Sequence, residues 1–261
     1  HMKTAILIAV EDYADKSIRP VKYAEADATE LAAVLVQHGF NESDRLMLIN
    51  GAATKTIIES RVRKTIATLT EDDVVYFYYA GHGFSKNDRN FITCHDTQRS
   101  DLDRTSIPLD WLFGQFKTSH CKRVVMLLDS CESGLLATAD MRGIYSDLTD
   151  DELKEFFEQS EHCICFAACK TGEESWPSGQ LKHGIWTYHV IEAFDGRAPG
   201  ALERNTLLTS GSLQNYLRAA IPRSLRTTYT DKKVQTPWMF GAHSGDFLLA
   251  DLGNLLESRK R

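Results

Sequence analysis

Short apolar segments alternate with amphipathic segments along this chain, and the alternation constrains the fold more than any other feature. Amphipathic helices are predicted where apolar residues recur at helical spacing, as in the Ala- and Leu-rich stretch at 23–40. The predicted strands are residues 3–10, 45–50, 73–80, 123–128 and 162–169, with 246–251 as a possible last strand. The predicted helices are residues 23–40, 54–69, 107–116, 183–194 and 210–221.

The predicted strands are apolar almost without interruption, which is typical of strands that are buried on both faces. Strands that alternate with helices form right-handed βαβ units, in which each crossover helix covers the sheet. The sequence therefore predicts an α/β fold with a mainly parallel sheet of about six strands and helices on both faces.

Charge, hydropathy and cysteine usage argue against a nucleic-acid-binding, membrane or disulfide-rich secreted protein. The net charge is −6, so no nucleic-acid partner is expected. No apolar run approaches the roughly 20 residues of a membrane span, and we expect no membrane contact. The six cysteines (94, 121, 131, 163, 165 and 169) lie in or beside apolar runs. They are interpreted as reduced thiols, and the protein as cytoplasmic.

Two polar clusters follow two predicted strands that are consecutive in the sequence. His82 stands between two glycines after strand 73–80, and Cys131 follows strand 123–128. Ligands of parallel α/β sheets bind outside the carboxyl ends of the strands. If the two strands are neighbours, the thiol and the imidazole meet there as a nucleophile and its base. Taken singly, each residue has a simpler explanation, since Cys is often buried packing and a loop His is often structural.

The glycines beside His82 allow the backbone to approach a ligand closely. We expect the N–H groups of Gly83 and Cys131 to stabilise an oxyanion, a contribution of roughly 3–4 kcal/mol per donor in other enzymes. Cys94 and His95 are adjacent, but no partner pair for them lies at zinc-site spacing, so no metal is expected. An α/β-hydrolase is disfavoured because no G-x-S-x-G or G-x-C-x-G elbow is present.

Together the clusters "YAGHG" and "DSCESG" resemble the histidine and cysteine motifs of the caspase-like clan of cysteine peptidases. Their separation of about 50 residues is that of caspases. The stretches "CICFAACKTGEESW", "KHGIWTYHVIEAFDG" and "QTPWMFG" are similar to the small-subunit part of the family. The resemblance spans residues 3–251. It implies a caspase-like three-layer sandwich and a cysteine endopeptidase with a dyad of Cys131 and His82.

Asp129 and Gly134 favour metacaspases and their bacterial relatives over animal caspases, which have Gln two residues before the Cys. In metacaspase-like enzymes, acids that match Asp27 and Asp129 hold a basic residue before the scissile bond. The resemblance thus implies cleavage after Arg, with Lys as a second choice, in exposed segments of protein or peptide substrates. Arg19 and Lys22 lie nearby in sequence and leave an Asp-specific protease open. A catalytically idle regulatory module is a further alternative.

The same resemblance places Cys169 and Trp176 in the substrate groove. It divides the single domain 3–251 into a large-subunit-like part 3–134, a mobile linker 135–161 and a small-subunit-like part 162–251. The bond after Arg142, or else Lys154, is expected to be a self-processing site. No cofactor is expected and Ca²⁺ dependence is not favoured, whereas a regulatory protein partner remains open. His1 and Met2 are interpreted as a cloning remnant, and 252–261 as a polar tail. Glu132 has no explanation.

Overall fold

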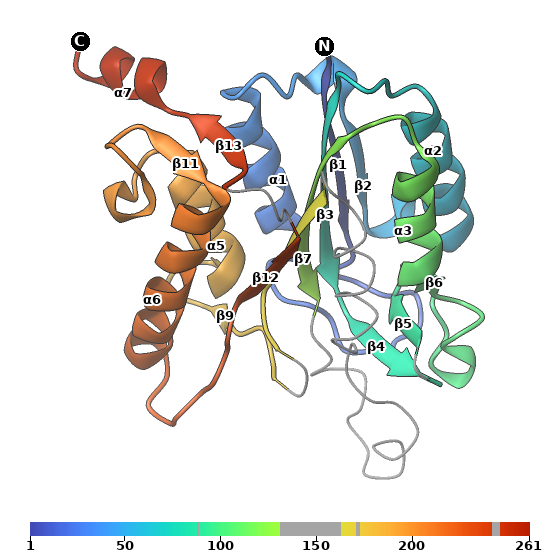
Figure 1. The fold of residues 1–261 in the computed structure, drawn as a ribbon. Coiled ribbons are helices and arrows are strands. Elements are labelled where there is room, and N and C mark those ends of the chain that lie inside the picture. The colour runs from blue at the N-terminus through green and yellow to red at the C-terminus, as the bar shows by residue number, and fades with distance from the viewer. Residues whose placement is uncertain (88, 131–162, 171–172, 242–245) are drawn as a thin grey trace.

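A six-stranded sheet forms the centre of the protein in the computed structural model (Figure 1). The structure describes residues 1–261 except 88, 131–162, 171–172 and 242–245. The strand order is β12-β8-β7-β3-β1-β2, and every neighbouring pair is parallel except β12 and β8. The bounds are β1 Lys3–Ala9, β2 Leu46–Ile49, β3 Val74–Gly81, β7 Arg123–Ser130, β8 Cys163–Ala167 and β12 Trp238–Gly241.

Helices cover both faces of this sheet, so the three-layer α/β fold class is confirmed (Figure 1). One face packs against α1, α5 and α6 through a core that contains Tyr78, Phe166 and Trp186. The other face packs against α2 and α3 around Phe77 and Phe116. The bounds are α1 Ala24–Val36, α2 Lys55–Ala67, α3 Leu109–Thr118, α5 Ile185–Phe194 and α6 Ser210–Thr228.

The register of β3 and β7 brings the two predicted polar clusters to one edge of the sheet. The last paired residues are Gly81 of β3 and Ser130 of β7. His82 follows β3 directly and lies beyond its carboxyl end. Cys131 is the next residue in the sequence after β7 and lies outside the described residues.

The sixth strand of the sheet is not the segment that the sequence suggested. Residues 246–251 contain β13 (Leu248–Asp251), which pairs with β11 (Leu207–Thr209) in a separate two-stranded sheet. The sheet is completed instead by β12, whose Trp238 pairs with Ala167. A strand pattern shows that a segment is extended but does not show its partner, which depends on where the helices place it.

Short elements between the predicted ones were not expected. A hairpin of β4 (Gly83–Lys86) and β5 (Arg89–Ile92) follows His82 and extends to β6 (Ile107–Pro108). A second, smaller pair consists of β9 (Pro177–Ser178) and β10 (His183–Gly184). The second pair lies near Asp27 of α1, which His183 contacts.

Helical structure near the C-terminus extends further than the sequence suggested. Helix α6 continues past Pro222, where a proline usually ends a helix, and the buried Leu225 anchors its last turns. The expected polar tail contains α7 (Gly253–Arg259), whose Arg259 guanidinium lies 2.8 Å from Asp195.

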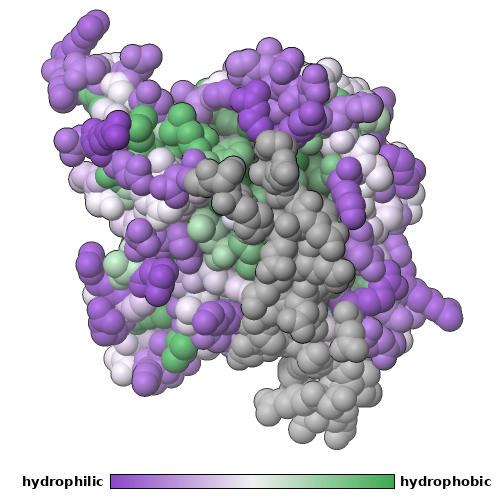
Figure 2. Space-filling view, in the orientation of Figure 1, coloured by the Kyte–Doolittle hydropathy of each residue, from purple (hydrophilic) through white to green (hydrophobic). Residues whose placement is uncertain are grey.

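The surface is mostly hydrophilic on the face shown in Figure 2. Hydrophobic side chains gather at the upper left, in the region where Figure 1 places β13. Leu248 of β13 is 55% exposed. Across the described part of the chain, the structure contains no helix with the length and apolar character of a membrane span.

Candidate active site at the carboxyl edge of the sheet

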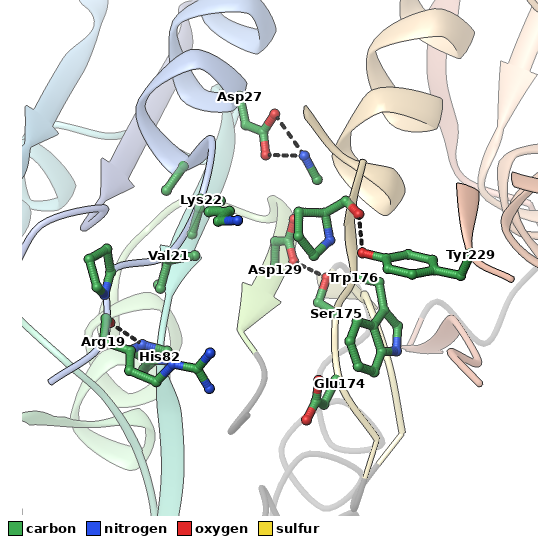
Figure 3. A pocket seen from close by; sticks show the side chains of 16 residues that line it. Arg19, Val21, Lys22, Asp27, His82, Asp129, Glu174, Ser175, Trp176 and Tyr229 are labelled. Atoms are coloured by element: carbon green, nitrogen blue, oxygen red, sulfur yellow. Dashed lines mark hydrogen bonds between the residues drawn. The ribbon is translucent and has the colours of Figure 1, made fainter. Parts of the chain in front are cut away.

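His82 is held in one orientation by contacts on two sides. Its Nε2 lies 2.7 Å from the carbonyl oxygen of Arg19 (Figure 3). Because a carbonyl only accepts, Nε2 carries the hydrogen, and Nδ1 is the basic nitrogen of the neutral ring. The ring stacks on Tyr13 at 5.4 Å between centroids, and the Tyr13 hydroxyl accepts a hydrogen bond from the backbone N–H of His82 at 3.0 Å. These contacts fix the orientation and the tautomer of the ring.

Close approaches exclude a side chain at Gly81 and disfavour one at Gly83. A Cβ on Gly81 would lie 2.3 Å from the hydroxyl oxygen of Tyr79, which is not possible without a shift. A Cβ on Gly83 would lie 3.3 Å from Ser130 and from the carbonyl oxygen of Phe91. The backbone at Gly83 therefore lies directly against the end of β7.

Asp129 is the last residue but one of β7, and only 8% of its surface is exposed. Its Oδ1 accepts a hydrogen bond from the Ser175 hydroxyl and its Oδ2 one from the Thr187 hydroxyl, both at 2.7 Å. Burial raises the pKa of this carboxyl group, and the two hydroxyl donors offset part of that rise.

Asp27 reaches the same place from the first turn of α1. It is 2% exposed. Its Oδ1 lies 2.6 Å from Nδ1 of His183, and its Oδ2 accepts a hydrogen bond from the Gly184 N–H at 3.0 Å. Burial, aided by the charge of Asp129, raises its pKa to about 7, although His183 and Gly184 act in the opposite direction.

Gly184 lies between the two carboxyl groups. A Cβ at this position would lie 2.9 Å from Oδ2 of Asp27 and 3.3 Å from Oδ2 of Asp129. The absence of a side chain therefore lets both acids approach one point. Figure 3 shows them at the inner end of a shared pocket.

This pocket is a cavity of about 310 Å³, and it brings together four of the predicted site residues: Asp27, His82, Asp129 and Trp176. His82 and Arg19 lie on one side of it, and Glu174, Trp176 and Tyr229 lie on the other (Figure 3). Such a volume is within the range of small-ligand pockets. The cavity can enclose one long side chain with its charged end between the carboxylates.

Hydrogen bonds and ring contacts fix the side of the cavity opposite His82, which contains Trp176 and Tyr229. The backbone N–H of Trp176 donates to the Gln235 side chain at 2.9 Å, and the Glu173 carboxylate accepts a hydrogen bond from the Thr236 N–H at 2.6 Å. The Trp176 ring lies edge-on to Tyr229, with 5.4 Å between centroids, and its centroid lies 4.2 Å from the Lys233 ammonium group.

Several polar partners of the two acids were not anticipated from the sequence. His183, Ser175 and Thr187 are ordinary loop and helix residues in a linear reading. The only available signal was that His183 and Thr187 lie in "KHGIWTY" and Ser175 in "KTGEESW", stretches already matched to the family.

Cys169 differs from the expectation of a reduced thiol in the groove. It is not among the residues that line the cavity, and it is disulfide-bonded. Cys169 lies two residues beyond the carboxyl end of β8. The number and spacing of cysteines in a sequence do not show which of them are bonded. By contrast, Cys94, Cys121 and Cys165 are buried thiols.

Cys131, Glu132, Gly134, Arg142 and Lys154 lie outside the described residues. The thiol, the proposed processing bonds and one of the two oxyanion donors are therefore not part of the geometry above. Among the residues that are described, no group of three or more His, Cys, Asp or Glu side chains is placed to hold a metal ion.

The buried acids make a prediction about stability. An unfolded chain ionises Asp27 near its ordinary pKa of about 3.9, whereas the folded protein keeps the proton until about pH 7. The unfolded state binds fewer protons in this window, so the free energy of unfolding falls as pH rises from about 4 to 7. We expect Asp27→Asn to raise the free energy of unfolding at pH 8 by roughly 1–3 kcal/mol and to have little effect at pH 4.

Urea unfolding of both proteins at pH 4, 6 and 8 measures this difference. Asp231→Asn is the matched control, because Asp231 is exposed and its pKa is lowered by Lys233. If Asp27→Asn showed the same pH slope as the parent, the buried ionisation would be refuted.

Comparisons with known proteins agree with the fold. The family model described as "Caspase domain" matches residues 2–247. Among solved structures, the crystal structure of protein GSU0716 from Geobacter sulfurreducens is similar, with a TM-score of 0.61 and 17% identity. The match covers 92% of this chain and 93% of that one. At this identity the likeness shows a shared fold. No curated protein matches the sequence.

Proposed function

The chain belongs to the caspase-domain family of cysteine peptidases, and on this premise we propose that it is an endopeptidase that cleaves after Arg, and less readily after Lys. The observation that carries the specificity is the pair of buried carboxyl groups, Asp27 and Asp129, at the inner end of the cavity beside His82. A guanidinium group can bind such a pair with several N–H donors at once, whereas an ammonium group binds as a single point of charge.

The positions of the cations argue against a preference for acidic residues. Arg19 and Lys22 line the cavity, but neither is buried. A cation in contact with water is solvated and contributes little to binding, whereas a charge in a buried site interacts strongly. An acidic substrate side chain would have to approach the two buried acids, so cleavage after Asp is disfavoured.

The chemistry proposed for the dyad follows from the fixed orientation of His82. Nδ1 takes the proton of the Cys131 thiol, and the thiolate attacks the scissile carbonyl carbon. The N–H groups of Gly83 and Cys131 stabilise the oxyanion that forms. The protonated His82 then gives its proton to the leaving amine, and water hydrolyses the thioester with His82 as the base. Each proton taken up is returned within one turnover.

The substrates are protein segments with an exposed basic residue, and no step requires a cofactor or Ca²⁺. Substrates of this kind include the chain itself at Arg142, with Lys154 as the second choice. A regulatory protein partner is compatible with this proposal.

A cleavage profile on a diverse peptide library tests the specificity. We expect Arg to be preferred over Lys before the scissile bond, and Asp to be rejected, with the same profile in EDTA and in Ca²⁺. Mass spectrometry of the incubated enzyme is expected to reveal fragments that end at Arg142. The profile of an Asp-cleaving protease would overturn the pocket assignment, and an inactive parent protein would favour the idle regulatory module.

A further inference from the structure

His183 joins the buried acid Asp27, at the inner end of the cavity, to an acid that lies outside the cavity. Its Nδ1 lies 2.6 Å from Oδ1 of Asp27, and its Nε2 lies 2.8 Å from Oε2 of Glu30. When Asp27 and Glu30 are both ionised, their oxygens only accept, so both ring nitrogens carry a hydrogen. That form of the ring is the imidazolium cation.

The three groups come together because of their positions on two elements. Asp27 and Glu30 lie one turn apart on α1 and project from the same face of the helix. His183 is the first residue of β10, whose neighbour Gly184 also contacts Asp27. The Asp27 and His183 side chains are 3% and 8% exposed, whereas that of Glu30 is 56% exposed. The imidazole ring of His183 thus links the exposed carboxylate of Glu30 to the buried carboxyl group of Asp27 in the cavity.

Glu30 is not part of the cavity itself. It lines an adjoining, open groove of about 620 Å³ together with Glu11, Tyr23 and Glu25, and this groove shares Pro20 and Lys22 with the cavity. A substitution at Glu30 therefore leaves the shape of the inner pocket intact and changes only the electrostatics that reach it through His183.

The sign of this effect follows from the charges. A buried carboxyl group resists ionisation, and a neighbouring cation favours it. Glu30 favours the imidazolium form of His183, and the pKa of His183 is raised mainly by Asp27, with Glu30 acting in the same direction. The imidazolium in turn lowers the pKa of Asp27 below the value that burial alone would set.

We propose that Glu30, acting through His183, is a positioning residue that sets the pH range in which Asp27 is ionised and the pocket accepts a basic side chain. This inference rests on the proposed function, because it concerns the pocket that would hold the substrate's Arg. Binding of a cationic side chain favours the ionised pair of acids, so binding below neutral pH releases a proton.

Other ionisable groups lie near Asp27, His183 and Glu30. The test leaves these groups unchanged. Asp129 of β7 raises the pKa of Asp27, and the charge of Asp27 acts on Tyr78 of β3. The remaining groups are Tyr188 and Glu192 of α5, and Arg19 and Lys22 on the cavity wall.

The first experiment compares the pH profile of KM and kcat for an Arg peptide in the parent, Glu30→Gln and Glu25→Gln. Glu25 is the matched control, since it lies on the same helix and groove but contacts Asn50. In Glu30→Gln we expect the pH at which KM improves to move upward by about half a unit, because an exposed ion pair contributes modestly. The kcat at saturating substrate is expected to remain that of the parent. His183→Gln is expected to shift the profile further, and Glu30→Asp to restore part of it.

The second experiment needs no turnover. Benzamidine, an arginine mimic, is titrated calorimetrically into Cys131→Ala at pH 6 and 8 in buffers of different ionisation enthalpy. We expect proton release at pH 6, and a larger release from the double variant that also carries Glu30→Gln. Equal profiles for Glu30→Gln and Glu25→Gln would overturn the inference while benzamidine still binds. A parent that neither binds benzamidine nor cleaves basic peptides would instead overturn the proposed function.

Discussion

Replacing Cys131 by Ala is expected to abolish peptide hydrolysis, and replacing His82 by Ala to lower kcat/KM by about 10³-fold or more. Alanine at position 131 has no atom that can form the thioester, so no acyl-enzyme can arise. Alanine at position 82 leaves the thiol without a base at a pH below its ordinary pKa of about 8.5. Fluorogenic Arg peptides at neutral pH measure both losses.

The control for the nucleophile is Cys121→Ala, which removes another thiol that is 6% exposed and lies before β7, far from the carboxyl edge of the sheet. This variant is expected to retain the activity of the parent. The rate of alkylation of Cys131 by iodoacetamide separates the two roles in the dyad. At pH 6, His82→Ala should slow alkylation, because fewer thiolates form. Peptide cleavage by Cys131→Ala at the parent rate would show that the nucleophile is wrongly assigned.

The second large effect is expected at the carboxyl groups that would bind the substrate. Asp129→Asn and Asp27→Asn should each lower kcat/KM for Arg peptides by about 10²-fold or more, since removing one partner of a buried charge pair costs roughly 2–5 kcal/mol. The loss should appear mainly in KM. In Asp129→Asn the hydroxyls of Ser175 and Thr187 can still contact the new amide group, so the fold is expected to persist.

Glu174→Gln is the matched control for these substitutions. Glu174 lines the same cavity and carries the same charge, but it is only half-buried, at the rim. We expect a change of less than about tenfold, because a solvated charge contributes little. If all three variants behaved alike, the general acidity of the cavity, and not the two buried acids, would determine the preference for Arg.

Much of the fold could be predicted because it depends on local patterns. Apolar runs such as that of β3 and helical spacing such as that of α1 identify elements without knowledge of their partners. The glycines around His82 could be recognised as a site of close approach, but the groups that approach them, such as Tyr79 and Ser130, are known only from the structure. The exchange of β12 for the 246–251 segment could not be predicted, because pairing between strands depends on distant parts of the chain.

The candidate site also has features that the sequence predicted and features that only the tertiary structure shows. By itself, the sequence determined the order of strands and helices, the positions of His82 and Asp129 at strand ends, and the family resemblance. Only the tertiary structure decided that Asp27 meets Asp129 across Gly184, that the Arg19 carbonyl orients His82, and that His183 connects Asp27 to Glu30. The physical reason is that burial and hydrogen bonding set the ionisation of an acid, and both depend on residues that are far away in the chain.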